Sequence, residues 1–395
     1  MRIVVLGYMV RGPIGGMAWS DLHYLLGLRH LGLDVYFLED SHDFPMCYDP
    51  GRNETGTDPT YGLAFAARIF EENGFENRWA YYDAHRTSWS GPRAADAVSI
   101  CESADIVLNL GGVNPLRDWT RAVRVRVLVD KDPVFTQIRN LTDAYSRALA
   151  QEHNRFFTYG ESYGAATSRI PDDGLPWCRT RHPVFLTAWP ALEPAEGGSF
   201  TTVMQWDSYP AREHDGVRYG MKSESFGPYA RLPRATDQRL ELAVGGSSVP
   251  REELIANGWV LSNPLEVARE PDDYRRYIRA SKGELTVAKH GYVMSNSGWF
   301  SERTASYLAS GRPAIVQETG FSRWLPTGSG VVSFSDPEEA AEALRAITGD
   351  YRRHCRDARA LAEEYFDSRK VLTDLLERCG GAPSLGVAQA ESAEA

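Results

Sequence analysis

The chain has 395 residues, 43% of them hydrophobic and 24% charged, and a formal net charge of −10 at pH 7. This length predicts two domains rather than one core, and the composition is typical of a soluble globular protein. The acidic balance argues against a nucleic-acid-binding face, which needs a stripe of basic residues. The sequence has no apolar run long enough for a secretion signal or a membrane span, and its five cysteines are dispersed without a C-x-x-C pair. We therefore expect a cytoplasmic protein without disulfides, a zinc site or a membrane span.

The first half of the chain alternates strand and helix patterns. We expect strands at 3–6, 35–38, 105–110, 125–129 and 155–159, and helices at 19–30 and 61–73. Gly32 and Gly74 follow these helices, at the place where glycine commonly ends a helix. Because helices and not hairpin turns separate the strands, the pattern predicts a parallel, doubly wound α/β sheet.

A second α/β domain is predicted after a linker rich in proline and glycine at 189–198. Strand patterns then recur at 200–206, 240–244, 259–261, 285–288, 314–316 and 330–334. Asp336 and Pro337 are expected to begin the next helix, and a long helical segment is expected at 351–379. The predicted domains are therefore 1–190 and 199–376, with a disordered tail at 380–395.

Two adjacent glycines, Gly15 and Gly16, lie in the turn between the first strand and the first helix. Such glycines let backbone N–H groups approach an anion at a helix N-terminus, although a simple turn would also use them. The G-x-G-x-x-G dinucleotide fingerprint is absent.

Three carboxylates of the first domain are candidate general bases. Asp132 follows a buried strand, at the edge where α/β sheets bind ligands, but Asp-Pro is also a typical pair at a helix start. Glu161 is placed similarly after a later strand, and Asp21 lies in the first helix near His23, which we interpret as a residue of the helix face. Asp130-Lys-Asp132 also has the spacing of a metal-binding Asp-x-Asp pair, an alternative that belongs to a different fold.

The second domain offers candidate anion ligands. Lys222 and Lys289 are placed to face a cleft between the domains, where lysines neutralise a phosphate leaving group. Ser297 and Gly298 precede a predicted helix at 299–309, and Arg303 lies one turn into it. A helix N-terminus with such residues is a candidate phosphate site.

The block 299–320 resembles the donor-binding half of B-type (GT-B) glycosyltransferases. The segments Tyr307-Leu-Ala-Ser-Gly-Arg-Pro-Ala, Gln317-Glu-Thr-Gly-Phe and Asp336-Pro-Glu-Glu are similar to bacterial group 1 glycosyltransferases, especially their spore-maturation-related branch. The first domain matches through Gly15-Gly16 and Leu31-Gly-Leu-Asp-Val. The resemblance implies two Rossmann-like domains across a cleft, a metal-independent reaction, and donor contacts that include Thr319 and Gly320.

Retaining members of that family carry two glutamates eight positions apart, and those places here hold Gly298 and Ser306. The second glutamate of the family normally binds the ribose hydroxyls. With serine at that place, thymidine diphosphate, which carries 2′-deoxyribose, becomes a candidate donor nucleotide beside uridine and guanosine diphosphate. Glu302, one helical turn before Ser306, could substitute for the missing glutamate. Retaining or inverting stereochemistry stays open. The resemblance implies sugar transfer from a nucleotide-sugar co-substrate to a small-molecule or glycan hydroxyl, without a cofactor. A nucleotide-sugar 2-epimerase and a non-catalytic nucleotide-sugar binder remain alternatives.

Overall fold

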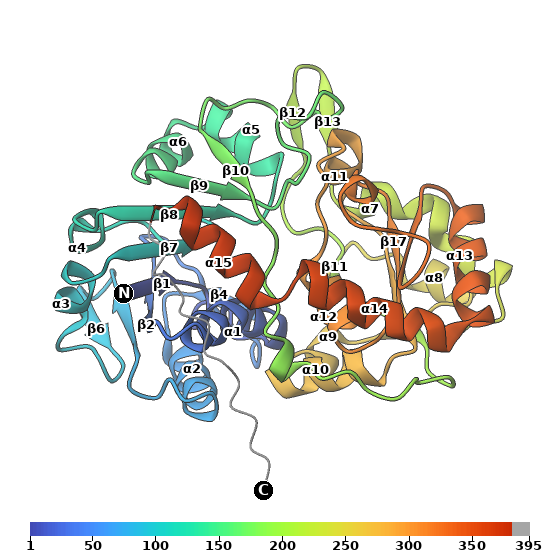
Figure 1. Cartoon of the computed structure of the whole chain (residues 1–395), viewed down its shortest axis with the longest axis horizontal. Coiled ribbons are helices and arrows are strands. Elements are labelled where there is room, and N and C mark those ends of the chain that lie inside the picture. The colour runs from blue at the N-terminus through green and yellow to red at the C-terminus, as the bar shows by residue number, and fades with distance from the viewer. Residues whose placement is uncertain (381–395) are drawn as a thin grey trace, which may run out of the picture.

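Two α/β domains lie side by side in a computed structural model of the chain, which describes residues 1–380 (Figure 1). Each domain contains a mainly parallel sheet flanked by helices, so the expected class of two Rossmann-like domains is confirmed. Residues 381–395 of the predicted tail lie outside the described residues.

The first domain is built on an eight-stranded sheet with the order β10-β9-β8-β7-β1-β2-β5-β6. Its strands are β1 (Arg2–Leu6), β2 (Asp34–Asp40), β5 (Trp79–Asp83), β6 (Ser88–Ser90), β7 (Ile106–Leu110), β8 (Val125–Asp130), β9 (Arg155–Thr158) and β10 (Trp177–Arg179). The run Ile3 to Leu6 is buried, as expected for a central parallel strand that is covered on both faces.

The helices of this domain are α1 (Gly15–His30), α2 (Thr60–Glu72), α3 (Ala97–Glu102), α4 (Asp118–Arg121), α5 (Phe135–Thr142) and α6 (Ala144–Gln151). The first of them is almost entirely buried, because α15 and α10 pack against it as well as the sheet. Gly32 and Gly74 follow α1 and α2 with φ angles of +78° and +73°. They are thus in the left-handed conformation that glycine provides after helices.

The second domain contains a six-stranded parallel sheet with the order β15-β14-β11-β16-β17-β18. Its strands are β11 (Phe200–Gln205), β14 (Leu240–Gly245), β15 (Val260–Ser262), β16 (Gly283–Thr286), β17 (Ala314–Gln317) and β18 (Val331–Phe334). Its helices are α7 (Lys222–Phe226), α8 (Arg251–Ala256), α9 (Pro264–Val267), α10 (Pro271–Ala280), α11 (His290–Ser295), α12 (Glu302–Ala309), α13 (Pro337–Gly349) and α14 (Tyr351–Tyr365). The Asp336 carboxylate accepts the Glu339 N–H, which confirms the expected cap of α13.

The expectation that hairpins are absent was wrong. Strand β6 pairs antiparallel with β5, and two small hairpins, β3 (Cys47–Asp49) with β4 (Glu54–Gly56) and β12 (Arg212–His214) with β13 (Val217–Tyr219), stand apart from the main sheets. These strands have three residues each, so no alternating pattern marks them in the sequence.

The predicted helix at 351–379 is two helices, because the chain turns at Phe366 and Asp367. Asp367 caps α15 (Ser368–Arg378) by accepting the Arg369 N–H, and α15 returns to the first domain, where it packs on α1. At this crossing, the Val184 N–H donates to the Phe366 carbonyl at 2.7 Å, and the Ser368 N–H donates to the Val184 carbonyl at 2.9 Å. The two segments that join the domains therefore pair with each other.

Candidate functional site

A cleft of about 1060 Å³ separates the two domains. It lies at the carboxyl ends of β11 and β16, where the strand order of the second sheet reverses and α/β folds bind their ligands. Among the described residues, its charged side chains are five cations and one carboxylate, namely Lys131, Lys222, Arg251, Lys289, Arg303 and Glu302. The cleft is thus strongly electropositive inside an acidic protein.

Lys222, the first residue of α7, is buried and makes no ion pair within the described chain. Burial lowers the pKa of its ammonium well below the usual value, and the nearby Arg303 lowers it further. A buried cation without a counter-ion is costly, so the free energy of this site would improve on binding an anion.

Arg303 lines the same cleft from α12 but is already held by the second domain. Its guanidinium donates to Glu284 at 2.6 Å, to the Val203 carbonyl at 2.7 Å and to Thr286 at 2.8 Å. The Glu284 side chain is fully buried. Arg303 is therefore both part of the cleft wall and the partner of a buried carboxylate.

Lys289 and Asp132 form a contact between the domains. The Lys289 Nζ lies 3.0 Å from Asp132 Oδ1 and 2.8 Å from the Tyr209 hydroxyl, and the Tyr209 and Tyr292 hydroxyls both donate to the Asp132 carboxylate. Burial alone would raise the pKa of Asp132, but Lys289 and the two hydroxyl donors outweigh it and hold that pKa below the usual value. Asp132 is thus an ion-paired link, and its side chain does not cap α5.

None of the three candidate bases is among the residues that line the cleft, and Asp21 and Glu161 are bonded elsewhere. The buried carboxylate of Asp21 accepts the Tyr8 N–H at 2.8 Å, and burial raises its pKa. Glu161 pairs with Arg181 at 2.6 Å in the loop after β9. His23, two residues after Asp21, is fully buried, and its Nδ1 accepts the Phe185 N–H at 3.0 Å. It therefore supports the segment that joins the domains.

Gly15 and Gly16 bring α1 against the second domain. The Gly15 N–H donates to the Ala268 carbonyl at 2.8 Å, and a Cβ at this position would lie 2.4 Å from the Glu270 carbonyl oxygen. Gly16 lines the cleft and faces Tyr274. The close approach of the two domains therefore explains why residue 15 is a glycine, while Gly16 is accessible to a ligand in the cleft.

Helix α12 begins at Glu302, three residues later than predicted, and Trp299 before it stacks on Tyr292 with ring centroids 4.3 Å apart. Four predicted donor contacts, Ser297, Gly298, Thr319 and Gly320, are not part of the cleft wall. The Gly298 N–H donates to the Thr319 carbonyl at 2.7 Å, and Ser297 is fully buried. The left-handed Gly298 and Gly320 allow close packing on Ser162 and Asn296.

Ser306 is also away from the cleft surface: its buried hydroxyl donates to the Glu302 carbonyl at 3.3 Å. Glu302 itself lines the cleft. Burial raises the pKa of its carboxyl from 4.5 to about 7, against the opposing effect of Lys131. The structure thus brings together Gly16, Lys222, Lys289, Glu302 and Arg303 of the predicted residues.

Sequence reasoning missed several polar residues of the cleft. Lys131 lies between the two aspartates of Asp130-Lys-Asp132 and donates to Ser20, while Tyr159 ends the first-domain strand pattern at 155–159. Arg251 and Asn263 come from the starts of α8 and α9. Their positions after parallel strands were a usable signal, because the carboxyl ends of β8 and β9 in the first sheet and of β14 and β15 in the second both face the cleft.

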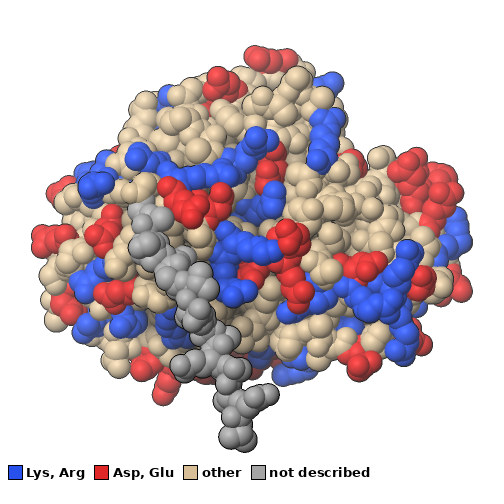
Figure 2. Space-filling view, in the orientation of Figure 1, with Lys and Arg blue, Asp and Glu red and all other residues tan. Residues whose placement is uncertain are grey.

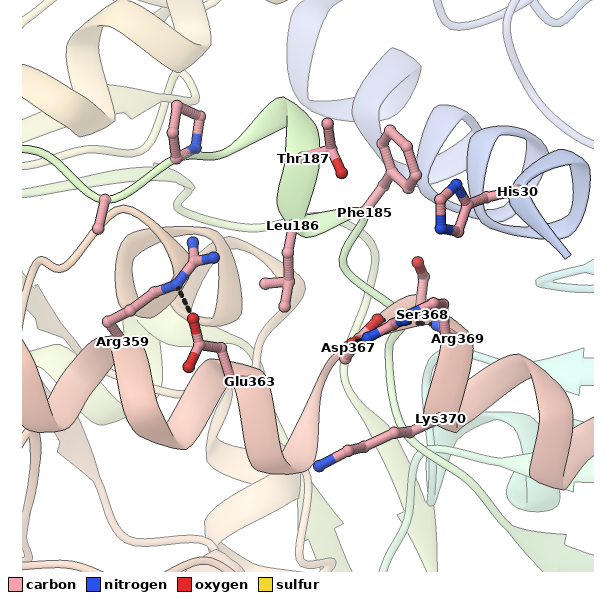
Figure 3. A pocket seen from close by; sticks show the side chains of 12 residues that line it. His30, Phe185, Leu186, Thr187, Arg359, Glu363, Asp367, Ser368, Arg369 and Lys370 are labelled. Carbon is pink, nitrogen blue, oxygen red and sulfur yellow. Dashed lines mark hydrogen bonds and ion pairs between the residues drawn. The ribbon is translucent and has the colours of Figure 1, made fainter. Parts of the chain in front are cut away.

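A second hollow, of about 850 Å³, lies where the linker between the domains meets α14 and α15 (Figure 3). In it, Arg359 pairs with Glu363 at 2.6 Å and Arg369 pairs with Asp367 at 3.2 Å. Because these cations already have carboxylate partners, this hollow suits a polyanion less well than the cleft does.

We compared the chain with protein-family models and with solved structures. Residues 230–377 match the family model described as glycosyl transferase-like. An alpha-glucosyltransferase solved with UDP has a TM-score of 0.57 at 10% identity, with 96% of this chain and 100% of that chain covered. The chain has the GT-B fold. Anabaena HepE with UDP and glucose (TM-score 0.56, 12% identity, 96% and 99% covered) and Thermosynechococcus elongatus sucrose-phosphate synthase (0.53, 10%, 96% and 98%) are similar as well. No curated protein sequence matches.

Within this GT-B chain, residues 1–380 contain no cluster of three or more His, Cys, Asp or Glu side chains arranged to hold a metal ion. None of the described helices is both long and apolar enough to cross a membrane. On the face that carries α14 and α15, basic and acidic side chains are interspersed (Figure 2).

Proposed function

We propose that this protein is a glycosyltransferase that moves a sugar from a nucleotide-diphosphate donor to a hydroxyl group of a small molecule or glycan. The observation that carries the proposal is the charge of the cleft, where five cations surround one carboxylate at the switch point of the second domain. Displacement of a nucleoside diphosphate leaves negative charge on the departing phosphate, and fixed cations stabilise that charge.

The donor diphosphate would bind near Lys222 and Arg303, with the N-terminus of α12 directed at it. Lys222 is the strongest support, because it is buried without an ion pair in the described part of the chain. In this proposal, protein cations take the place of a metal ion, so activity should survive EDTA. The acceptor would approach from the first domain, past Lys131 and Tyr159.

The nucleotide is proposed to be a uridine, thymidine or guanosine diphosphate. Ser306, at the family's ribose-gripping place, is buried and bonded to the Glu302 carbonyl, which leaves no carboxylate there for two ribose hydroxyls. UDP and its 2′-deoxy form should therefore bind within about tenfold of each other. A site that hydrogen-bonds a hydroxyl rejects the analogue that lacks it by up to about 10⁴-fold. Calorimetric titration of both compounds decides this point.

The activity itself is tested with UDP-glucose, TDP-glucose and GDP-glucose in the absence of an acceptor. A glycosyltransferase slowly transfers the sugar to water, an epimerase returns an isomer of the donor, and a binder returns the donor unchanged. Free sugar and nucleoside diphosphate are the expected products. A protein that binds nucleotides but never releases free sugar from these donors is not a transferase.

An acidic chain should also show no affinity for a short DNA duplex, and binding of such a duplex would contradict the proposed acceptor class.

A further inference from the structure

Glu302 is the single carboxylate among the described residues that line the cleft. It occupies the first position of α12, next to Arg303, and is oriented toward the first domain. A carboxylate in a basic donor site repels a diphosphate, so its presence there calls for a role other than phosphate binding.

The surroundings of Glu302 come from several elements of both domains. Its Oε1 lies 3.5 Å from His182 Nε2, and neither atom has a hydrogen-bond partner within the described chain. Ser20 of α1 bonds to the Glu302 carboxyl. Lys131 and Asp21 of the first domain and Arg303 of its own helix are the nearby charged groups.

Behind His182 lies a chain of hydroxyl groups. His182 Nδ1 is 3.1 Å from the Tyr159 hydroxyl, which is 2.7 Å from the Tyr24 hydroxyl. Burial keeps the pKa of His182 well below its usual value, so its imidazole is neutral. A neutral imidazole orients the carboxyl without fixing it in the charged form. The long, unsatisfied contact is of the kind that tightens when a catalytic site is occupied.

The alternative carboxylates are occupied elsewhere. Asp132 is neutralised by Lys289 and two tyrosine hydroxyls, Asp21 is buried on the Tyr8 N–H, and Glu161 is paired with Arg181 outside the cleft. A base must reach the acceptor oxygen directly or through one water molecule. Of the acids in the described chain, only Glu302 lines the cleft that would hold the donor and the acceptor.

We propose that Glu302 is the general base that receives the proton of the acceptor hydroxyl, and that His182 is its positioning residue. This inference rests on the proposed function. In the step, the acceptor oxygen forms a bond to the anomeric carbon, and the bond from that carbon to the diphosphate breaks with its electron pair going to the diphosphate. The acceptor proton passes to the Glu302 carboxylate and leaves to solvent after product release.

The ionisation of Glu302 fits this role. Burial raises its pKa to about 7, which lets the carboxylate form at neutral pH while keeping it basic enough to accept a proton. An exposed glutamate would be a weaker base by more than two powers of ten in proton affinity.

The test measures hydrolysis of UDP-glucose, TDP-glucose and GDP-glucose from pH 5 to pH 9, with water as acceptor. In the wild type, kcat/KM is expected to rise with pH and level off above about pH 7. Glu302→Gln should lower kcat by about 10²–10⁴-fold, remove this inflection and leave UDP affinity within about threefold. Glu342→Gln, an exposed glutamate of α13, is the matched control and should behave as wild type.

His182→Phe should move the inflection and lower kcat with little change in KM, and His182→Gln should restore part of both. A folded Glu302→Gln variant that hydrolyses the donor with the wild-type pH profile overturns the inference while the proposed function stands. A variant that loses UDP affinity but not affinity for 2′-deoxy-UDP assigns Glu302 to the ribose and also overturns it. A wild type that hydrolyses none of the three donors refutes the proposed function instead.

Discussion

Replacing Arg303 with methionine should destabilise the protein strongly, before any effect on a ligand is considered. The Arg303 side chain is 14% exposed and its partner, the Glu284 side chain, is 0% exposed. Glu284 Oε2 already lacks a hydrogen-bond partner among the described residues, and Arg303 is the one ion-pair partner of this carboxylate there, while the ammonium of Lys222 acts on it from further away. Removing one member of a buried pair costs about 3–5 kcal/mol because the other charge is left without compensation. We expect the free energy of unfolding to fall by that amount.

The assay is urea unfolding followed by tryptophan fluorescence at pH 7. Arg276→Met is the matched control, because the Arg276–Asp273 pair on α10 is exposed and should contribute less than about 1 kcal/mol. Adding Glu284→Gln to Arg303→Met should recover about half of the loss, since the buried charge is then gone. If Arg303→Met lowers the free energy of unfolding no more than Arg276→Met does, Arg303 does not compensate the buried charge of Glu284.

Three further outcomes are expected. Lys222→Met should stabilise the ligand-free protein, because it removes a buried cation without an ion pair, yet weaken UDP binding by about 1.5–3 kcal/mol in calorimetry. Asp132→Asn should lower the free energy of unfolding at pH 7 by about 1.5–3 kcal/mol and leave the pH profile of hydrolysis unchanged. Because the native pKa of Asp132 is depressed, the difference in unfolding free energy between wild type and variant is present above pH 3.8 and disappears as the pH falls below it. Glu302→Gln should be more stable than wild type at pH 8 but not at pH 5. Because the native pKa of the Glu302 carboxyl is raised from 4.5 to about 7, the free energy of unfolding of the wild type falls by about 3 kcal/mol as the pH rises across that window. Urea unfolding at several pH values checks both charge variants, and a pH-independent difference would contradict either assignment.

The order of strands and helices could be predicted because its signals are local. Buried apolar runs, Gly32 and Gly74 after helices, and the Asp336 cap each act within a few residues, and the structure confirms them. Lys289 was also found from a local signal, since a residue after a strand of a parallel sheet lies near its ligand-binding edge, whereas Lys222 lines the cleft although it follows the antiparallel strand β13.

Other features depend on contacts between residues that are distant in the sequence. The break at Asp367 lets α15 pack on α1 of the first domain, more than 300 residues away in the sequence. Glu302 meets His182 only because α12 lies close to the buried segment after β10. No periodicity or cap in the sequence encodes such a pairing, although Asp367-Ser368 was a capping signal that could have marked the break.

The charge arrangement links nucleotide binding to the contact between the domains. Of the five cations in the cleft, Arg303 and Lys289 have carboxylate partners in the described chain, whereas Lys131, Lys222 and Arg251 have none. A diphosphate bound beside Lys222 would also attract the ammonium of Lys289, which now compensates Asp132 across the domain boundary. Both anions would then compete for one ammonium, and each would alter the affinity of the other by the same factor. Nucleotide binding should therefore loosen the Asp132 contact, and tightening that contact should weaken nucleotide binding.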